Sequence, residues 1–126
     1  MKTVINTVNA PAPIGPYSQA IEAGNFIFFS GQVAINPVTN ELVLDDIKTE
    51  TTQVMENIKA LLTEAGIGFG NIVKTTIFLK DMQTFAQVNE VYGSYFTEKF
   101  PARETVAVAG LPKNVNVEIS VTAVKG

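Results

Sequence analysis

The sequence predicts an α+β fold in which two helices cover one face of a mixed β-sheet. Two segments, 47–65 and 81–96, repeat apolar residues at the three- and four-residue spacing of an amphipathic helix. Runs of alternating or β-branched residues lie before, between and after them, as expected for strands. The 126 residues contain no repeat and no linker, so residues 1–126 are expected to form one domain.

A hairpin is expected near the N-terminus, after an irregular start. The prolines at 11, 13 and 16 oppose regular strand pairing in the first segment. Residues 20–35 then carry two apolar runs separated by Gly24 and Asn25, which tolerate the positive φ of a tight turn.

The helix expected at 47–65 has signals at both ends. Asp45 and Asp46 precede it as capping candidates, and Gly66 follows it. A strand is expected next at 71–80, because NIVKTTIFLK alternates and is rich in β-branched residues. After the second helix, RETVAVAG and VNVEISVTAV are expected to form two strands joined by a turn at LPKN.

The composition excludes several kinds of chemistry. The absence of cysteine removes disulfides, thiolate nucleophiles and zinc–sulfur sites, and the absence of histidine removes the commonest general base and metal ligand. With a net charge of −3 and scattered lysines, the chain has no basic stripe for nucleic acid. No phosphate-binding loop or metal motif occurs, so neither a cofactor nor a metal is expected. No segment has the pattern of a membrane span or signal peptide, and a cytoplasmic location is therefore expected.

The stretch FIFF at 26–29 is apolar on both sides of its predicted strand. Two helices cover only one face of a sheet, so a second copy of the chain is expected to cover the other. The alternative is a strand tucked under a loop.

Arg103 is the only arginine among nine basic residues. Its planar fork of donors suits a carboxylate held at two points. The simpler interpretation is a structural salt bridge to a nearby glutamate.

Glu118 lies in a strand whose apolar residues occupy the other side. It is either part of a solvated strand face or a carboxylate that handles water. If the strands of Arg103 and Glu118 pair through the LPKN turn, the two charges share a site.

Ser30 and Gly31 interrupt a strand pattern. A glycine there indicates either a bulge that turns an N–H toward a ligand or a simple kink. Tyr17 follows the proline-rich segment, where its phenol either faces a cleft or packs against the fold.

Six segments taken together resemble the RidA family, also called YjgF, of enamine and imine deaminases. They are GPYSQA, FSGQ, VKTTIFLKDM, VNEVYGSYF, FPAR and LPKNVNVEI, and they span almost the whole chain in order. The resemblance implies a six-stranded sheet with two helices on one face, a homotrimer like the small trimeric chorismate mutases, and ligand clefts between subunits. It also implies hydrolysis of 2-aminoacrylate and 2-iminobutanoate to 2-oxo acids and ammonia, without a cofactor.

The resemblance assigns roles to particular residues. Arg103 would hold the substrate carboxylate and Glu118 would position the attacking water. The residues that would line the cleft are Tyr17, Ser30, Gly31 and Asn89, together with Thr105, which occupies a position where many members have cysteine.

Two other functions remain open on the sequence alone. The same cleft could sense 2-oxo acids or amino acids without turnover, because Arg103 serves either purpose. Endoribonuclease activity, attributed to some relatives, ranks lower because the chain lacks histidine and a basic surface.

Overall fold

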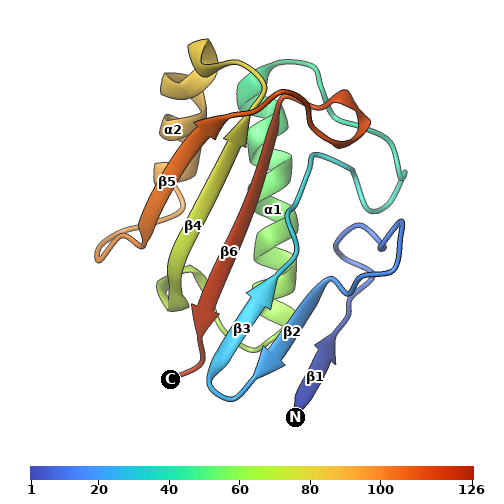
Figure 1. Cartoon of the computed structure of the whole chain (residues 1–126), viewed down its shortest axis with the longest axis vertical. Helices are drawn as coiled ribbons and strands as arrows, with labels where there is room; N and C mark the ends of the chain where they lie inside the picture. The colour runs from blue at the N-terminus through green and yellow to red at the C-terminus, as the bar shows by residue number, and fades with distance from the viewer.

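The computed structural model describes all 126 residues as one α+β domain. Its sheet has six strands in the order β1-β2-β3-β6-β4-β5 (Figure 1). Neighbouring strands are antiparallel except β4 and β5, which are parallel. The strands are β1 (Lys2–Ile5), β2 (Ala20–Ala23), β3 (Phe26–Phe29), β4 (Ile72–Leu79), β5 (Ala102–Ala107) and β6 (Val117–Val124).

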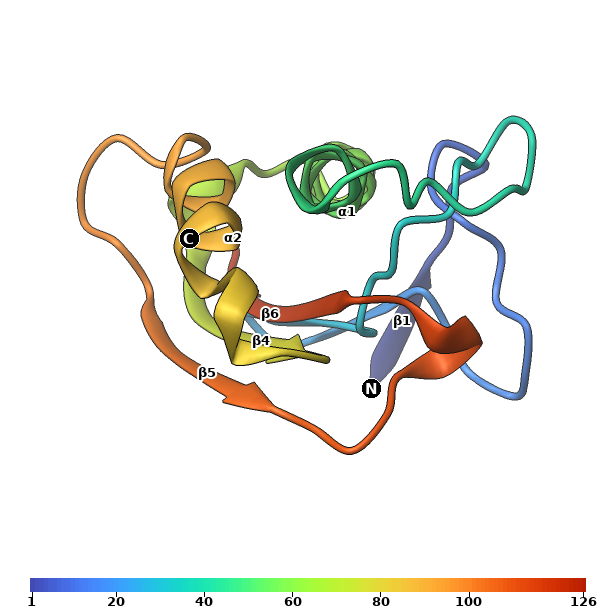
Figure 2. The ribbon, with the colours of Figure 1, turned by 90° about the horizontal axis from the view of Figure 1, so that it is seen from above.

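Both helices, α1 (Ile47–Glu64) and α2 (Phe85–Gly93), lie on the same face of the sheet (Figure 2). The predicted fold class is therefore confirmed. The core fills the space between the helices and the sheet, where Val54, Ile58 and Leu61 of α1 are buried with Ile77 and Ile119 of the sheet. No helix is long and apolar enough to cross a membrane.

The expected signals fix the ends of α1. The Asp46 carboxylate accepts a 2.8 Å hydrogen bond from the Thr49 N–H, which satisfies a donor that has no partner within the helix. This bond and a second one, donated by the Thr49 hydroxyl, lower the pKa of Asp46. Gly66 follows the helix with φ +77°, a conformation that suits glycine. Gly24 likewise has φ +61° in the turn between β2 and β3, so the predicted hairpin is confirmed.

The second helix is shorter than the segment 81–96 that was expected. Asp81 accepts a hydrogen bond from the Gln83 N–H at 2.9 Å, and this forms a separate 3-10 turn at Met82–Thr84 before α2. Beyond α2 the apolar period continues through Phe96, whose ring packs 4.8 Å from that of Tyr92. The pattern therefore reflects continued packing against the core rather than one continuous helix.

The face of the sheet opposite the helices is partly apolar and open. Ile27 and Phe29 point into the core, whereas Phe26 and Phe28 are about half exposed on the other side and their rings stack 6.1 Å apart. This strand is therefore buried on one side only within the single chain, and burial of its other side by a second copy stays a prediction.

Three buried polar side chains attach irregular segments to this framework. Gln19 accepts from the Thr7 N–H and donates to the carbonyl groups of Thr7, Ala10 and Pro11. Asn57 of α1 donates to the carbonyl groups of Val33 and Ile35, at 3.1 and 3.0 Å. The backbone of these segments is thus satisfied by side chains where no strand partner is present.

Glu50 of α1 is the third of these side chains. Its carboxylate is completely buried, and it accepts hydrogen bonds from the backbone N–H and the side-chain amide of Asn116, both at 2.8 Å. The Val117 N–H lies 3.3 Å away and also donates to it. A buried carboxylate is tolerated when it is hydrogen-bonded in this way. Glu50 thereby fixes the position at which β6 begins.

We expect Glu50→Gln to lower the free energy of unfolding by about 2 kcal/mol, because an amide oxygen cannot replace both carboxylate oxygens and the amide NH2 would face other donors. Urea denaturation at fixed protein concentration measures this loss. Glu64→Gln, at the exposed end of the same helix, is the matched control and should change stability by less than about 0.5 kcal/mol. Equal stability of the Glu50 variant and the control would contradict the assigned role.

Candidate functional site

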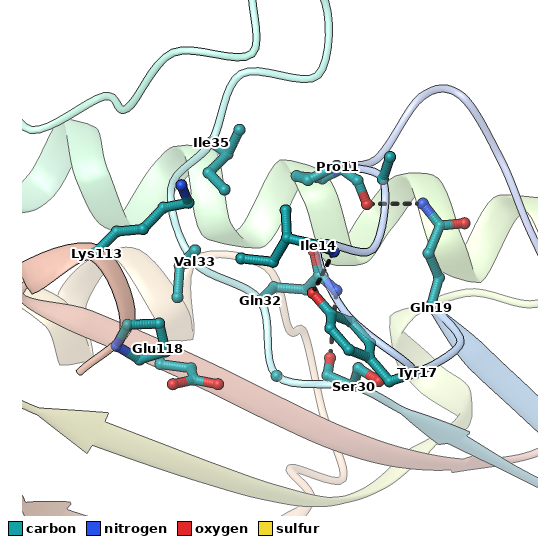
Figure 3. Close-up of a pocket in the computed structure, with 13 residues that line it drawn as sticks. Pro11, Ile14, Tyr17, Gln19, Ser30, Gln32, Val33, Ile35, Lys113 and Glu118 are labelled. Carbon is teal, nitrogen blue, oxygen red and sulfur yellow. Dashed lines mark hydrogen bonds between the residues drawn. The ribbon is translucent and has the colours of Figure 1, made fainter.

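A cleft of about 340 Å³ opens beside the start of β6 (Figure 3). Three irregular segments line it: 11–19, 30–35 and the turn at 112–113. Glu118 is the one strand residue that contributes to it. Each segment, or the strand that follows it, is held by one of the three buried side chains described above, so the cleft is built on a fixed framework.

The Glu118 carboxylate lies against Gly31. A Cβ atom at position 31 would come within 2.9 Å of the Glu118 carboxyl carbon and closer still to one of its oxygens, so only glycine leaves this space free. Glu118 is half-buried, and burial raises the pKa of its carboxyl above the ordinary value of 4.5. The site thus contains a carboxylate that holds a proton more readily than a surface glutamate does.

The segment that carries Gly31 is bulged. Phe28 pairs with Thr122, but Gln32 pairs with Ile119, so β3 gains one residue relative to β6 between these positions. The N–H groups on either side of Gly31 are bonded to the fold, from Ser30 to the Gln19 carbonyl and from Gln32 to the Ile119 carbonyl. The Gly31 N–H has no partner within the chain. The bulge is therefore confirmed, and it leaves one backbone donor free beside Glu118.

Tyr17 and Ser30 also line the cleft, as expected. The Tyr17 ring is about half exposed, and its hydroxyl accepts from the Ile14 N–H at 3.3 Å. The Ser30 hydroxyl donates to the Ser18 carbonyl at 2.6 Å. These bonds hold both side chains at the wall of the cleft (Figure 3).

Arg103 lies elsewhere, at the edge of the sheet beneath α2. Its guanidinium donates to Asn89 Oδ1 at 2.6 Å and lies 5.2 Å from the centre of the Tyr92 ring and 5.7 Å from that of Phe85. Burial raises the pKa of Tyr92, whose hydroxyl donates to Thr75. Arg103 is therefore oriented by an amide and two neutral aromatic rings.

No carboxylate of the chain forms an ion pair with Arg103. The three salt bridges in the structure are made by Lys48, Lys74 and Lys125. The interpretation of Arg103 as half of a structural salt bridge is therefore wrong. A second hollow, lined by Arg103, Asn89 and Tyr92 among others, leaves the guanidinium accessible.

The strands of Arg103 and Glu118 do not pair, contrary to the sequence-based hypothesis. β5 pairs with one side of β4 and β6 pairs with the other, so β4 lies between them in the sheet. Arg103 aligns with Thr75, which faces α2, whereas Glu118 aligns with Phe78, which has the opposite parity on β4. Within one chain the two charges therefore lie on opposite faces of the sheet.

Thr105 shares the side of Arg103, as strand parity predicts, and Glu104 points away. Glu104 forms a 2.7 Å ion pair with Lys74, and hydrogen bonds from Lys74 and Thr76 lower its pKa. The Thr105 hydroxyl is buried without a hydrogen-bond partner. The Val108 N–H donates to the Leu79 carbonyl, and bonding alternates along a parallel edge strand, so the N–H of Thr105 points to the open edge of β5.

Sequence reasoning did not single out several residues of the cleft. Gln19, Ile14 and Lys113 line it, although none belongs to a pattern typical of a site. Gln19 had one usable signal, because a polar residue just after a proline-rich segment is well placed to bond its backbone. No group of three or more Asp or Glu side chains gathers in a way that could hold a metal ion.

The sequence of this chain is similar to those of known proteins over almost its whole length. Residues 7–125 match the family described as Endoribonuclease L-PSP. A RutC family protein of Pyrococcus horikoshii is 57% identical over 125 residues, and the alignment covers 99% of each chain. The 2-iminobutanoate/2-iminopropanoate deaminase of Escherichia coli is 48% identical over 128 residues, again covering 99% of each chain.

The fold agrees with a solved structure as well. The crystal structure of the YjgF gene product of E. coli superimposes with a TM-score of 0.94 at 46% identity, covering 98% of this chain and 99% of the other. The matched segments include both the Glu118 cleft and the Arg103 edge. The chain therefore belongs to the Endoribonuclease L-PSP family, the family of RidA and YjgF.

Proposed function

We propose that this protein hydrolyses small 2-imino acids, and their enamine tautomers such as 2-aminoacrylate, to 2-oxo acids and ammonia. The observation that carries this proposal is the division of the site into two incomplete halves. One half has an accessible arginine without a counter-ion, and the other has a half-buried carboxylate beside a free N–H.

In this proposal the two halves meet between subunits of a homotrimer. The exposed rings of Phe26 and Phe28 give the open face of the sheet an apolar surface suited to a second copy of the chain. Arg103 lies on the edge strand β5, where a neighbouring chain can approach it. Each site would then combine Arg103, Thr105 and Asn89 of one subunit with Tyr17, Ser30, Gly31 and Glu118 of its neighbour.

The Arg103 half suits the carboxylate of an imino acid. The guanidinium presents parallel donors, and the unpaired Thr105 N–H at the same edge can add a third. Asn89 and the two rings hold the guanidinium in place, so little side-chain entropy is lost when substrate binds. The carboxylate would therefore fix the position of the neighbouring imine carbon.

The Glu118 half suits the attack of water. A protonated imine is already electrophilic, so the water requires orientation and a proton acceptor of modest strength. Glu118 accepts the proton as the water oxygen bonds to the imine carbon, which gives a carbinolamine. Glu118 then returns this proton to the amino group. As the C–N bond breaks and ammonia leaves, Glu118 takes the proton of the remaining hydroxyl, which becomes the carbonyl of the 2-oxo acid, and this proton passes to the released ammonia and restores the carboxylate. An enamine first takes a proton at its terminal carbon to become the imine.

Two rival functions use the same features less well. A sensor of oxo or amino acids needs the Arg103 half but gives no reason for a carboxylate with a raised pKa beside a free N–H. RNA cleavage, which the family description names, normally relies on histidine or metal ions and a basic surface. The chain has no histidine and a net charge of −3.

The direct test is the release of ammonia and oxo acid from 2-iminobutanoate generated in situ. We expect Glu118→Gln to lower the rate by about 100-fold or more, the usual contribution of a general base. Arg103→Lys keeps the charge but loses the fork, and it should lower kcat/KM by about 10- to 100-fold. The control Glu64→Gln should retain full activity. If the folded wild type does not accelerate the reaction, the deaminase proposal is wrong and a binding role replaces it.

The acid limb of the pH profile provides a second test. Glu118 acts as a base only when ionised, so kcat/KM should fall as the pH drops through its pKa. Because burial raises this pKa, the midpoint should lie above the ordinary 4.5. The residual activity of Glu118→Gln should lack this limb. A midpoint at or below 4.5, or the same limb in the variant, would exclude Glu118 as the base.

A further inference from the structure

Lys113 is the only cationic residue that lines the Glu118 cleft. Figure 3 shows its side chain extending from the turn at Pro112–Asn114 toward Val33 and Ile35, on the same side of the cleft as Glu118. The mechanism proposed above gives this ammonium group no role.

The charge of Lys113 is not used within the chain. Its Nζ forms no hydrogen bond, and the three salt bridges of the structure involve other lysines. No ion pair joins Lys113 to Glu118, whose pKa is raised by burial. The cleft therefore offers a free positive charge at a distance from its reacting end.

The backbone holds Lys113 in an unusual conformation. Lys113 and Asn114 both have positive φ, 55° and 58°, which costs energy for residues other than glycine. The turn is fixed by hydrogen bonds from the Asn114 N–H to the Leu111 carbonyl and from Lys80 Nζ to Asn114 Oδ1, at 3.1 and 2.8 Å. The completely buried Val115 follows directly. The fold therefore sets the direction in which the Lys113 side chain leaves the backbone.

An apolar wall accompanies this charge. Ile14, Val33 and Ile35 line the same cleft as Lys113. When Glu118 faces the imine carbon and Arg103 of a neighbouring subunit holds the carboxylate, the substituent of the imino acid must extend into the remaining space. A short methylene chain would pass along the apolar wall toward Lys113.

We propose that Lys113 forms a subsite for a second anionic group, so that the protein accepts imines derived from dicarboxylic amino acids such as glutamate. This inference rests on the proposed deaminase function and adds the class of substrate to it. Lys113 is here a specificity-determining residue, because it contacts the far end of the substrate and not the reacting atoms.

The test compares two imines of equal chain length, released in situ by an amino-acid oxidase. Glutamate gives 2-iminoglutarate and norvaline gives 2-iminopentanoate, which has a methyl group in place of the terminal carboxylate. We expect Lys113→Met to lower the ratio of kcat/KM for 2-iminoglutarate to kcat/KM for 2-iminopentanoate by about tenfold, because one charge-assisted hydrogen bond is lost. Lys113→Arg should preserve the ratio, and Lys113→Glu should lower it further.

Lys59→Met, on the exposed surface of α1, is the control for the change in net charge and should leave the ratio unchanged. Thermal unfolding of each variant shows whether the protein still folds after the substitution. If Lys113→Met is unstable, Lys113→Gln replaces it in the comparison of the two imines. An unchanged ratio in Lys113→Met, with 2-iminobutanoate still hydrolysed, would overturn the subsite while leaving the deaminase intact. No acceleration of any imine by the wild type would instead overturn the proposed function.

Discussion

A buried carboxylate that lies outside the cleft determines where the cleft is. Glu50 accepts hydrogen bonds from Asn116 and Val117, and this fixes the first residues of β6 against α1. Glu118 follows one residue later, and the turn at Lys113 precedes it. Gln19 and Asn57 act in the same way on the other two walls. The irregular segments that surround Glu118 are therefore held in place by buried side chains that bond their backbone.

A second constraint is that Arg103 and Glu118 lie on opposite faces of the sheet. Strand parity and the intervening β4 place them on opposite faces of one sheet, so a single chain cannot bring them to one substrate. The environments also differ, because Arg103 is held by rings and an amide while Glu118 is held by burial beside Gly31. In our proposal, oligomerisation joins these halves, so assembly and activity depend on each other.

Local features of the fold were predictable because local chemistry decides them. The 47–65 helix, its Asp46 cap and the Gly24 turn each depend on neighbouring residues. Gly31 indicated either a bulge or a kink, and the structure decides for the bulge. The apolar character of the side of FIFF opposite the core could also be predicted, because side chains alternate between the two faces of a strand with a period of two residues.

Features that depend on strand order were not predictable in this way. The turn after β5 suggested that it pairs with the last strand, but the crossover through α2 makes β5 the parallel partner of β4 and leaves β6 on the other side. Glu50 looked like an ordinary residue in the first turn of a helix, because the donors that it serves lie more than 60 residues away. Lys113 belonged to an expected turn, and only the packed structure places it beside the cleft.

The measurement that tests the shared site most directly is activity in mixed oligomers. Arg103→Ala and Glu118→Ala chains, each inactive alone, would be unfolded together in equal amounts, refolded and assayed with 2-iminobutanoate. If each site takes Arg103 from one subunit and Glu118 from its neighbour, random mixing should restore about a quarter of wild-type activity per site. No recovery from the mixture, with oligomers of normal mass, would show that the two residues do not meet across an interface and would contradict the account.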